Sequence, residues 1–228
     1  RTVPYVSKVT GIPMCELAVK ASFGEKLPLY GIAPEPPYVT VKVPVFSFEK
    51  LAGLDTHLGP EMKSTGEVLG IGRDLTEALY KGLLAAGYKM KKSGGVLITV
   101  TDNDKKEIVP IAKRLLILGF SLYATRGTAM LLHKNGLPVQ VVEKIRDCKE
   151  NNTATLLDSR KVSYVISTSE KGRDPALDDV KIRRKACSLG VCCMTSIDTA
   201  NALIDSLLSG YTESSTELVE ISTLKNLR

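Results

Sequence analysis

Apolar and polar positions alternate in a regular order through the second half of the chain. Short apolar runs typical of buried strands occupy residues 95–100, 121–125, 138–142, 163–167 and 191–194. Between and after them, apolar residues recur every three or four positions, which predicts helices at residues 104–118, 128–134, 155–160, 178–189 and 196–209. Strands and helices that alternate at these lengths indicate an α/β domain, in which a five-stranded parallel sheet carries helices on both faces.

One of these predicted helices contains a proline. Pro110 lies inside the segment 104–118, and proline lacks a backbone N–H and clashes with the preceding helical turn. We therefore expect this helix to be kinked or to begin late.

The first 50 residues contain many residues that interrupt helices and strands, among them Gly11, Pro13 and the run 34–37. We expect irregular structure there, apart from a strand at residues 38–43, where apolar and polar side chains alternate. Pro44 should end that strand or restrict it to the edge of a sheet, because proline cannot donate a ladder hydrogen bond.

A capped helix is predicted in the following segment. Asp74 and Glu77 have the spacing of a capping box, and leucines then recur every four residues until Gly87. The preceding Gly70-Ile71-Gly72 should form a turn before this helix, since it lacks the third glycine of a dinucleotide-binding loop. Residues 88–93 are expected to form a polar linker.

The overall composition is that of an ordinary globular chain, with 43% hydrophobic and 25% charged residues. The net charge of +6 is spread along the chain, and the absence of Trp leaves no platform on which bases could stack, so we expect no nucleic-acid partner. No apolar stretch approaches the roughly 20 residues that span a bilayer, so we expect no membrane partner either. Because the chain begins without Met or a signal sequence, we expect it to be a piece of a longer cytoplasmic polypeptide.

The five cysteines give no sign of a metal centre or a disulfide framework. Cys15, Cys148, Cys187, Cys192 and Cys193 are odd in number and lack CxxC spacing, so we expect reduced thiols. Cys192 and Cys193 should point to opposite faces of one strand and therefore cannot jointly bind an ion. We expect no metal site.

Hydroxyl and cationic side chains recur where the predicted strands end. In a parallel sheet these ends share one edge, where ligands bind beside helix N-termini. The residues concerned are Thr99 and Lys105, Thr125 and Thr128 with the intervening Gly127, Lys144, and Ser167 and Ser169. This pattern favours a phosphate site; the alternative is the ordinary loop composition of an α/β domain.

Side chains for catalysis are not evident in the sequence. His57 and His133 are the only histidines, and both are expected to be surface residues. Asp178 and Asp179 are expected to cap the following helix rather than to act as acid and base. No Ser-His-Asp elbow, Walker loop or metalloprotease motif is present, so the residues indicate a binding domain without a catalyst.

Three motifs in the first 93 residues carry a resemblance to a known family. Residues 1–13 (RTVPYVSKVTGIP), 38–48 (YVTVKVPVFSF) and especially 59–68 (GPEMKSTGEV) resemble the C-terminal end of the large chain of carbamoyl-phosphate synthase. The remainder, with ATRGTA at 124–129 and IRRKA at 182–186, resembles the methylglyoxal-synthase-like allosteric domain of that family, which has a Rossmann- or flavodoxin-like fold. The resemblance implies an incomplete α+β ATP-grasp segment at 1–93, an allosteric domain at 94–210 and a polar tail at 211–228.

The resemblance also implies a function. The family makes carbamoyl phosphate from bicarbonate, glutamine-derived ammonia and two ATP, with Mg²⁺ or Mn²⁺, for pyrimidine and arginine biosynthesis. Arg1 stands at the edge of the synthetase active site, and the rest of that site is missing, so this chain alone should be inactive and should hold no ATP or metal. The implied partners are the rest of the large chain, the small glutamine amidotransferase chain and further copies in an oligomer.

The allosteric domain of the family binds a phosphorylated effector such as UMP, IMP or phosphoribosyl pyrophosphate. The resemblance assigns the phosphate to Lys105, Thr125, Thr128 and Lys144, with Thr99, Ser167 and Ser169 nearby.

Some positions depart from the family pattern. Family members often have Asn where Ser167 stands, and those activated by ornithine carry acidic residues near the positions of Val43 and Met194, so ornithine control is not expected. Methylglyoxal synthase itself needs a Gly-Gly-Asp-Gln-like stretch that this chain lacks. The remaining alternative is a structural or oligomerisation module that binds no ligand.

Overall fold

The computed structural model describes residues 2–28, 31–32, 35–47, 62–147, 150–168 and 178–221. The chain forms two compact units, which are described separately below. The first contains Arg1–Val45, Gly66–Gly87 and Ser209–Arg228, and the second contains Phe46–Thr65 and Tyr88–Leu208. Among the described residues, no helix combines the length and apolar character needed to cross a bilayer.

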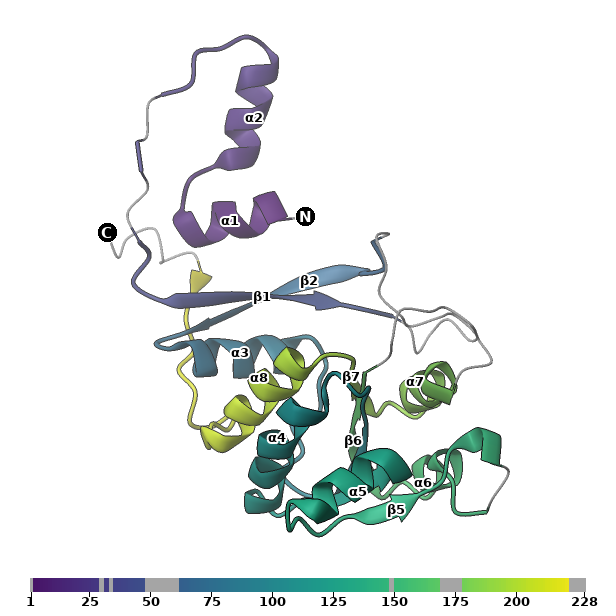
Figure 1. Ribbon diagram of the computed structural model, residues 1–228. Helices are drawn as coiled ribbons and strands as arrows, with labels where there is room; N and C mark the ends of the chain where they lie inside the picture. The colour runs from purple at the N-terminus through teal and green to yellow at the C-terminus, as the bar shows by residue number, and fades with distance from the viewer. Residues whose placement is uncertain are drawn as a thin grey trace. The chain divides into compact units, whose positions relative to one another are not determined.

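The first unit is built on a two-stranded antiparallel sheet with a helix packed against it (Figure 1). Strand β1 (Val39–Val45) pairs with β2 (Gly66–Gly72), and Val43 lies opposite Val68. Helix α3 (Leu75–Ala85) contacts both strands. Helices α1 (Thr2–Thr10) and α2 (Met14–Ser22) precede the sheet.

Two expectations for this unit are wrong. Residues 2–10 and 14–22 are helical rather than irregular, although neither helix contains a fully buried residue, and the segment from Gly11 to Pro13 separates the two helices. Gly70 and Gly72 lie inside β2 rather than in a turn. Both glycines let α3 approach closely, because a Cβ at Gly70 would lie 2.0 Å from the carbonyl oxygen of Ala78.

The cap of α3 confirms the capping signal, with one difference. The Asp74 side chain accepts a hydrogen bond from the Glu77 N–H at 2.8 Å, as expected of an N-cap. The Glu77 carboxylate, however, accepts the N–H of Arg73, not that of Asp74, at 2.9 Å. This shift leaves the other oxygen of Glu77 available to the C-terminal segment.

The described part of the C-terminal segment, up to residue 221, belongs to the first unit. The Tyr211 hydroxyl donates to Asp74 at 2.9 Å, and the Glu217 N–H donates to Glu77 at 3.2 Å. Arg73 also pairs with the Glu217 carboxylate at 3.0 Å. These polar contacts hold the segment 211–217 on the N-terminal end of α3.

The second unit is the α/β domain that the sequence predicts. Its five strands are all parallel, in the order β5-β4-β3-β6-β7. Their bounds are β3 (Gly95–Thr99), β4 (Ser121–Thr125), β5 (Gln140–Val142), β6 (Val162–Ser167) and β7 (Cys192–Met194). The apolar runs named above therefore supply all five strands, and the fold class is confirmed.

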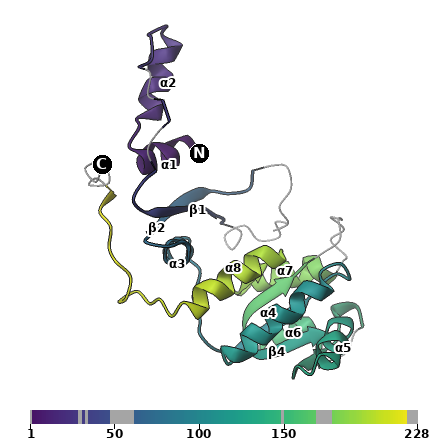
Figure 2. The ribbon, with the colours of Figure 1, turned by 60° about the vertical axis from the view of Figure 1, so that its left-hand side comes forward.

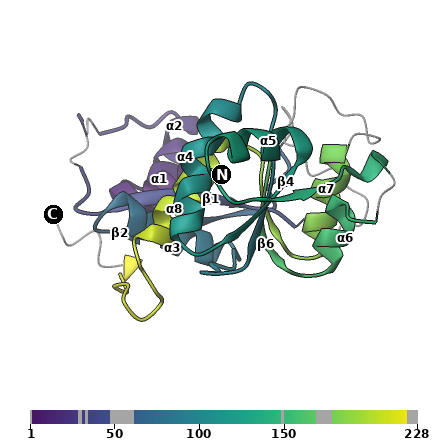
Figure 3. The ribbon, with the colours of Figure 1, turned by 60° about the horizontal axis from the view of Figure 1, so that its bottom comes forward.

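Helices cover both faces of this sheet (Figure 3). One group contains α4 (Lys105–Ile117), α5 (Arg126–Lys134) and α8 (Ile197–Leu208), and α4 contacts both others, with α8 running beside it (Figure 2). The other group contains α6 (Thr153–Asp158) and α7 (Asp178–Ser188), with a short 3-10 turn at Ile145–Asp147 before α6. Leu97, Val165 and Ile182 form part of the buried core under the second group.

Pro110 does not delay the start of α4. The helix begins at Lys105, one residue from the predicted start, and continues through Pro110 to Ile117. Because Pro110 is exposed, its ring lies on the solvent side of the helix.

Candidate functional site

The carboxyl ends of three adjacent strands place three hydroxyl side chains in one row. Ser167, the last residue of β6, lies opposite Thr99, the last residue of β3. Thr125 ends β4, and the register of β3 with β4 pairs the residues that precede Thr99 and Thr125. Because neighbouring strands lie about 4.8 Å apart, the three hydroxyls share one edge of the sheet.

The hydrogen bonding within this row is incomplete. The Thr125 hydroxyl donates to the Thr99 hydroxyl at 3.3 Å, and Thr125 is buried. Ser167 is fully buried, and its Oγ has no hydrogen-bond partner among the described residues. Buried hydroxyls usually find a partner, so an unpaired one at a strand end indicates a position where a ligand can supply it.

The loop after β3 is held in place from two sides. The Thr101 N–H donates to the Thr168 hydroxyl at 3.0 Å, and the Thr168 N–H donates to the Thr99 carbonyl at 3.1 Å. On the other side, the Val100 nitrogen lies 3.5 Å from the Thr128 hydroxyl. Thr168 belongs to the run of hydroxyl residues at the end of β6, but its role in holding this loop depends on the register of β6 with β3, which the sequence does not reveal.

Two lysines approach this edge. Lys105 is the first residue of α4, and its Nζ lies 3.6 Å from the position that a Cβ on Gly127 would occupy. Lys144 is half-buried and follows β5 by two residues. The Lys105 Nζ forms an ion pair with Asp102, and this pair, with a smaller contribution from the charge of Lys144, holds the pKa of Asp102 below its usual value.

The N-terminus of α5 completes the arrangement. Its N-cap residue is Thr125, whose side chain makes no capping hydrogen bond, so Thr125 does not satisfy the first N–H groups of the helix. The positive end of the helix dipole adds to the charge of the lysines. An uncapped helix start, two cations and a buried unpaired hydroxyl together form a cradle suited to a small anion.

The structure brings six of the predicted site residues together. We call this set the strand-end cluster: Thr99, Lys105, Thr125, Thr128, Lys144 and Ser167. Two further predicted residues, Arg1 and Ser169, lie outside the described residues. That the cluster binds a ligand stays a prediction.

The histidines and paired carboxylates do not form an acid–base site where the structure describes them. His133 is exposed near the end of α5, while His57 lies outside the described residues. Asp178 and Asp179 lie within the first turn of α7 and form ion pairs with Arg146 at 3.7 Å and Arg183 at 3.0 Å. The carboxylates are thus engaged by arginines rather than arranged as an acid and base.

The described cysteines are free thiols. Cys15, Cys187, Cys192 and Cys193 form no disulfide, and Cys148 lies outside the described residues. Burial raises the pKa of both Cys192 and Cys193 to about 12, so neither is a thiolate at neutral pH.

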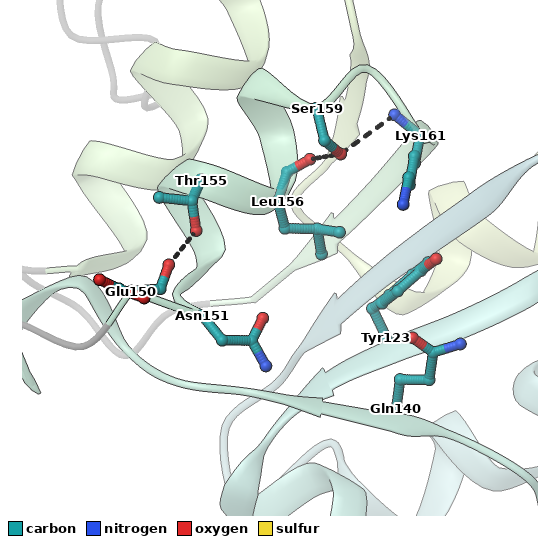
Figure 4. Close-up of a pocket in the computed structure, with 8 residues that line it drawn as sticks. All are labelled: Tyr123, Gln140, Glu150, Asn151, Thr155, Leu156, Ser159 and Lys161. Carbon is teal, nitrogen blue, oxygen red and sulfur yellow. Dashed lines mark hydrogen bonds between the residues drawn. The ribbon is translucent and has the colours of Figure 1, made fainter.

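A separate open pocket of about 390 Å³ lies between β4, β5 and α6 (Figure 4). Three of its polar side chains donate to backbone carbonyls of the chain: Thr155 to Glu150, Ser159 to Leu156 and Asn151 to Val141. None of its lining residues belongs to the strand-end cluster.

A family comparison bears on the second unit. Residues 107–195 match the model of the family described as MGS-like domain. The chain contains an MGS-like domain. The match includes Thr125, Thr128, Lys144 and Ser167 of the strand-end cluster, while Thr99 and Lys105 lie just before it. An MGS-like domain is consistent with the resemblance to the allosteric domain of carbamoyl-phosphate synthase.

Proposed function

We propose that this chain is the regulatory C-terminal region of a glutamine-dependent carbamoyl-phosphate synthase. In this proposal the MGS-like domain binds a phosphorylated effector, UMP, IMP or phosphoribosyl pyrophosphate, at the strand-end cluster. The observation that carries the proposal is the combination of Lys105, Lys144 and the uncapped start of α5 at the same sheet edge as the unpaired Ser167 hydroxyl.

The chemistry of the cluster suits a phosphate monoester. A phosphate carries about −1.5 to −2 charges near pH 7 and three acceptor oxygens. Lys105 and Lys144 would supply charge-assisted donors, the first N–H groups of α5 would supply neutral donors, and the Thr125 and Thr128 hydroxyls would fix the orientation. Ser167 would then pair with a part of the ligand beyond the phosphate.

The first unit fits the role of the last piece of a synthetase half, to which effector binding would be transmitted. Its α1 and α2 bury no side chain, and Val19 and Phe23 are exposed, as expected of surfaces that the remainder of an ATP-grasp lobe would cover. ATP and Mg²⁺ or Mn²⁺ would be used by the full-length enzyme. We expect no synthetase activity from the 228 residues alone.

Effector control of this kind is graded. A coupling free energy between two sites is typically about 1–3 kcal/mol, which changes an affinity by about 5- to 150-fold. We expect an effector to shift the activity of the full-length enzyme within that range.

The proposal is tested by calorimetric titration of UMP, IMP and phosphoribosyl pyrophosphate into the 228-residue chain, with uridine as the unphosphorylated control. We expect saturable binding of at least one phosphorylated ligand and none of uridine. Lys144→Ala should weaken that binding about tenfold or more, because it removes a charge-assisted hydrogen bond. Lys134→Ala is the matched control, since it removes the same charge from the opposite end of α5.

The outcomes separate this proposal from its alternative. Equal affinities of wild type and Lys144→Ala would contradict the assignment of the phosphate to the strand-end cluster. If neither this chain nor the full-length enzyme binds any of the three phosphorylated ligands, the domain is a structural or oligomerisation module.

A further inference from the structure

A carboxylate already forms an ion pair with one cation of the strand-end cluster, Lys105. Asp102 Oδ1 lies 2.6 Å from Lys105 Nζ, three residues further along the chain. The Asp102 side chain is 86% exposed, whereas that of Lys105 is 30% exposed. The lysine is therefore held at the sheet edge, and the carboxylate reaches it from the solvent side.

The position of Asp102 follows from a loop that is fixed on both sides of it. Thr101, the residue before it, donates its N–H to Thr168 and its hydroxyl to Asp104 Oδ2 at 2.9 Å. The Asp104 N–H returns to the Thr101 carbonyl at 3.2 Å, which closes a turn around Asp102. The turn directs the carboxylate to Lys105 at the start of α4.

The second lysine of the cluster acts on the same carboxylate. Lys105, through its ion pair, and Lys144, through its charge, both favour the ionised form of Asp102 and lower its pKa. These are the two cations that the proposed function assigns to the effector phosphate. Asp102 and a bound phosphate would thus compete for the same positive charge.

We propose that Asp102 is a resident counterion of the anion site, which a phosphorylated ligand must displace from Lys105. The inference rests on the proposed function. Displacement is feasible because a phosphate offers more negative charge and more acceptor oxygens than a carboxylate. Release of Asp102 also costs little free energy, because its side chain is already mostly exposed to water in the ion pair.

The counterion has two consequences. It lowers the affinity of the site for every anion, because each ligand must break the ion pair between Asp102 and Lys105. It also keeps Lys105 oriented toward the cluster when no ligand is bound, so that the cation need not be ordered at the moment of binding.

The experiment is a calorimetric titration of UMP, IMP and phosphoribosyl pyrophosphate into the 228-residue wild type and the variant Asp102→Asn at low ionic strength. We expect the variant to bind about two- to fivefold more tightly, the range expected for loss of one exposed ion pair. Glu107→Gln is the matched control, because Glu107 carries the same charge in the first turn of α4 and forms no ion pair in the described part of the chain. It should change the affinity less than Asp102→Asn does.

Two further measurements distinguish competition from a general charge effect. Asp102→Glu keeps the negative charge and should bind as the wild type does, whereas Asp102→Ser should bind more tightly, as Asp102→Asn does. Raising the salt to about 1 M shortens the screening length to about 3 Å, so the affinities of wild type and Asp102→Asn should converge.

The results also separate this inference from the proposed function. Tighter binding in Asp102→Asn and Asp102→Ser, with the wild-type affinity in Asp102→Glu, supports the counterion. Equal or weaker binding in Asp102→Asn, or an equal gain in Glu107→Gln, overturns the counterion and leaves the effector site intact. No saturable binding of UMP, IMP or phosphoribosyl pyrophosphate in either protein overturns the counterion, and it overturns the proposed function as well if the full-length enzyme also binds none of the three.

Discussion

The two units each contain a cluster of buried polar groups, and the two clusters differ in how their hydrogen bonds are completed. In the first unit the Glu77 side chain, 2% exposed, accepts the N–H groups of Arg73 and Glu217 and pairs with Lys81 at 2.7 Å. In the second unit Ser167 Oγ has no hydrogen-bond partner among the described residues, and Lys105 is paired only with an exposed carboxylate. A cluster whose polar groups all hydrogen-bond to one another stabilises the fold. A cluster that leaves a buried polar group without a hydrogen bond indicates a ligand.

The largest expected effect comes from a substitution in the cluster around Glu77, whose hydrogen bonds are complete. Glu77→Ala removes a buried carboxylate and leaves two part-buried N–H groups and Lys81 without their acceptor, so we expect the first unit to lose about 3 kcal/mol of stability. The measurement is amide hydrogen exchange in α3 and the segment 211–217. Effector binding should be unchanged.

The chain offers a matched control for this substitution. Glu16 pairs with Lys20 with the same spacing and the same distance, 2.7 Å, but both side chains are exposed. Glu16→Ala should leave the exchange rates unchanged, since exposed pairs contribute little. If Glu77→Ala and Glu16→Ala changed the exchange rates equally, burial of the ion pair would not be the cause of the stabilisation.

The pH dependence of the first unit is the next test. Burial would raise the pKa of Glu77, but Lys81 and the N–H groups of Arg73 and Glu217 outweigh it and lower the pKa from 4.5 to about 2. Because this folded-state pKa is depressed, the contribution of Glu77 is present above about pH 4.5 and is lost as the pH falls toward 2. Unfolding curves of the wild type should therefore show a loss of stability over that interval that Glu77→Gln lacks; parallel curves would refute the assignment.

The smallest expected effect comes from a substitution in the strand-end cluster, where the Ser167 hydroxyl lacks a described hydrogen-bond partner. Ser167→Ala removes a buried hydroxyl that has no described partner, so stability should stay the same or rise by up to about 1 kcal/mol, while effector affinity falls. Ser163→Ala on the same strand is the control, because its hydroxyl donates to the Ser93 carbonyl at 2.9 Å. This control should lose about 1 kcal/mol and keep its affinity. A clear loss of stability in Ser167→Ala would mean that this hydroxyl stabilises the fold and is not reserved for a ligand.

The second unit was more predictable from sequence than the first for a physical reason. Its strands are buried and therefore continuously apolar, as at Val96, Leu97 and Ile98, and its helices each bury one side, so periodicity reveals both. Helices α1 and α2 contain no fully buried residue, so burial gives them no strong pattern in the sequence. Gly70 and Gly72 were mistaken for a turn, because a glycine required by a neighbouring helix looks the same in sequence as one required by a turn.

The sequence by itself determined the alternation of strands and helices, the parallel sheet and the hydroxyls and lysines that follow its strands. These features depend on the local order of side chains, which the chain carries in any environment. Only the tertiary structure decided that Ser167 stands beside Thr99, that Thr168 holds the loop of Asp102 and that Glu77 binds the segment of Glu217. Those relations depend on strand register and on contacts between distant segments, and no local pattern encodes them.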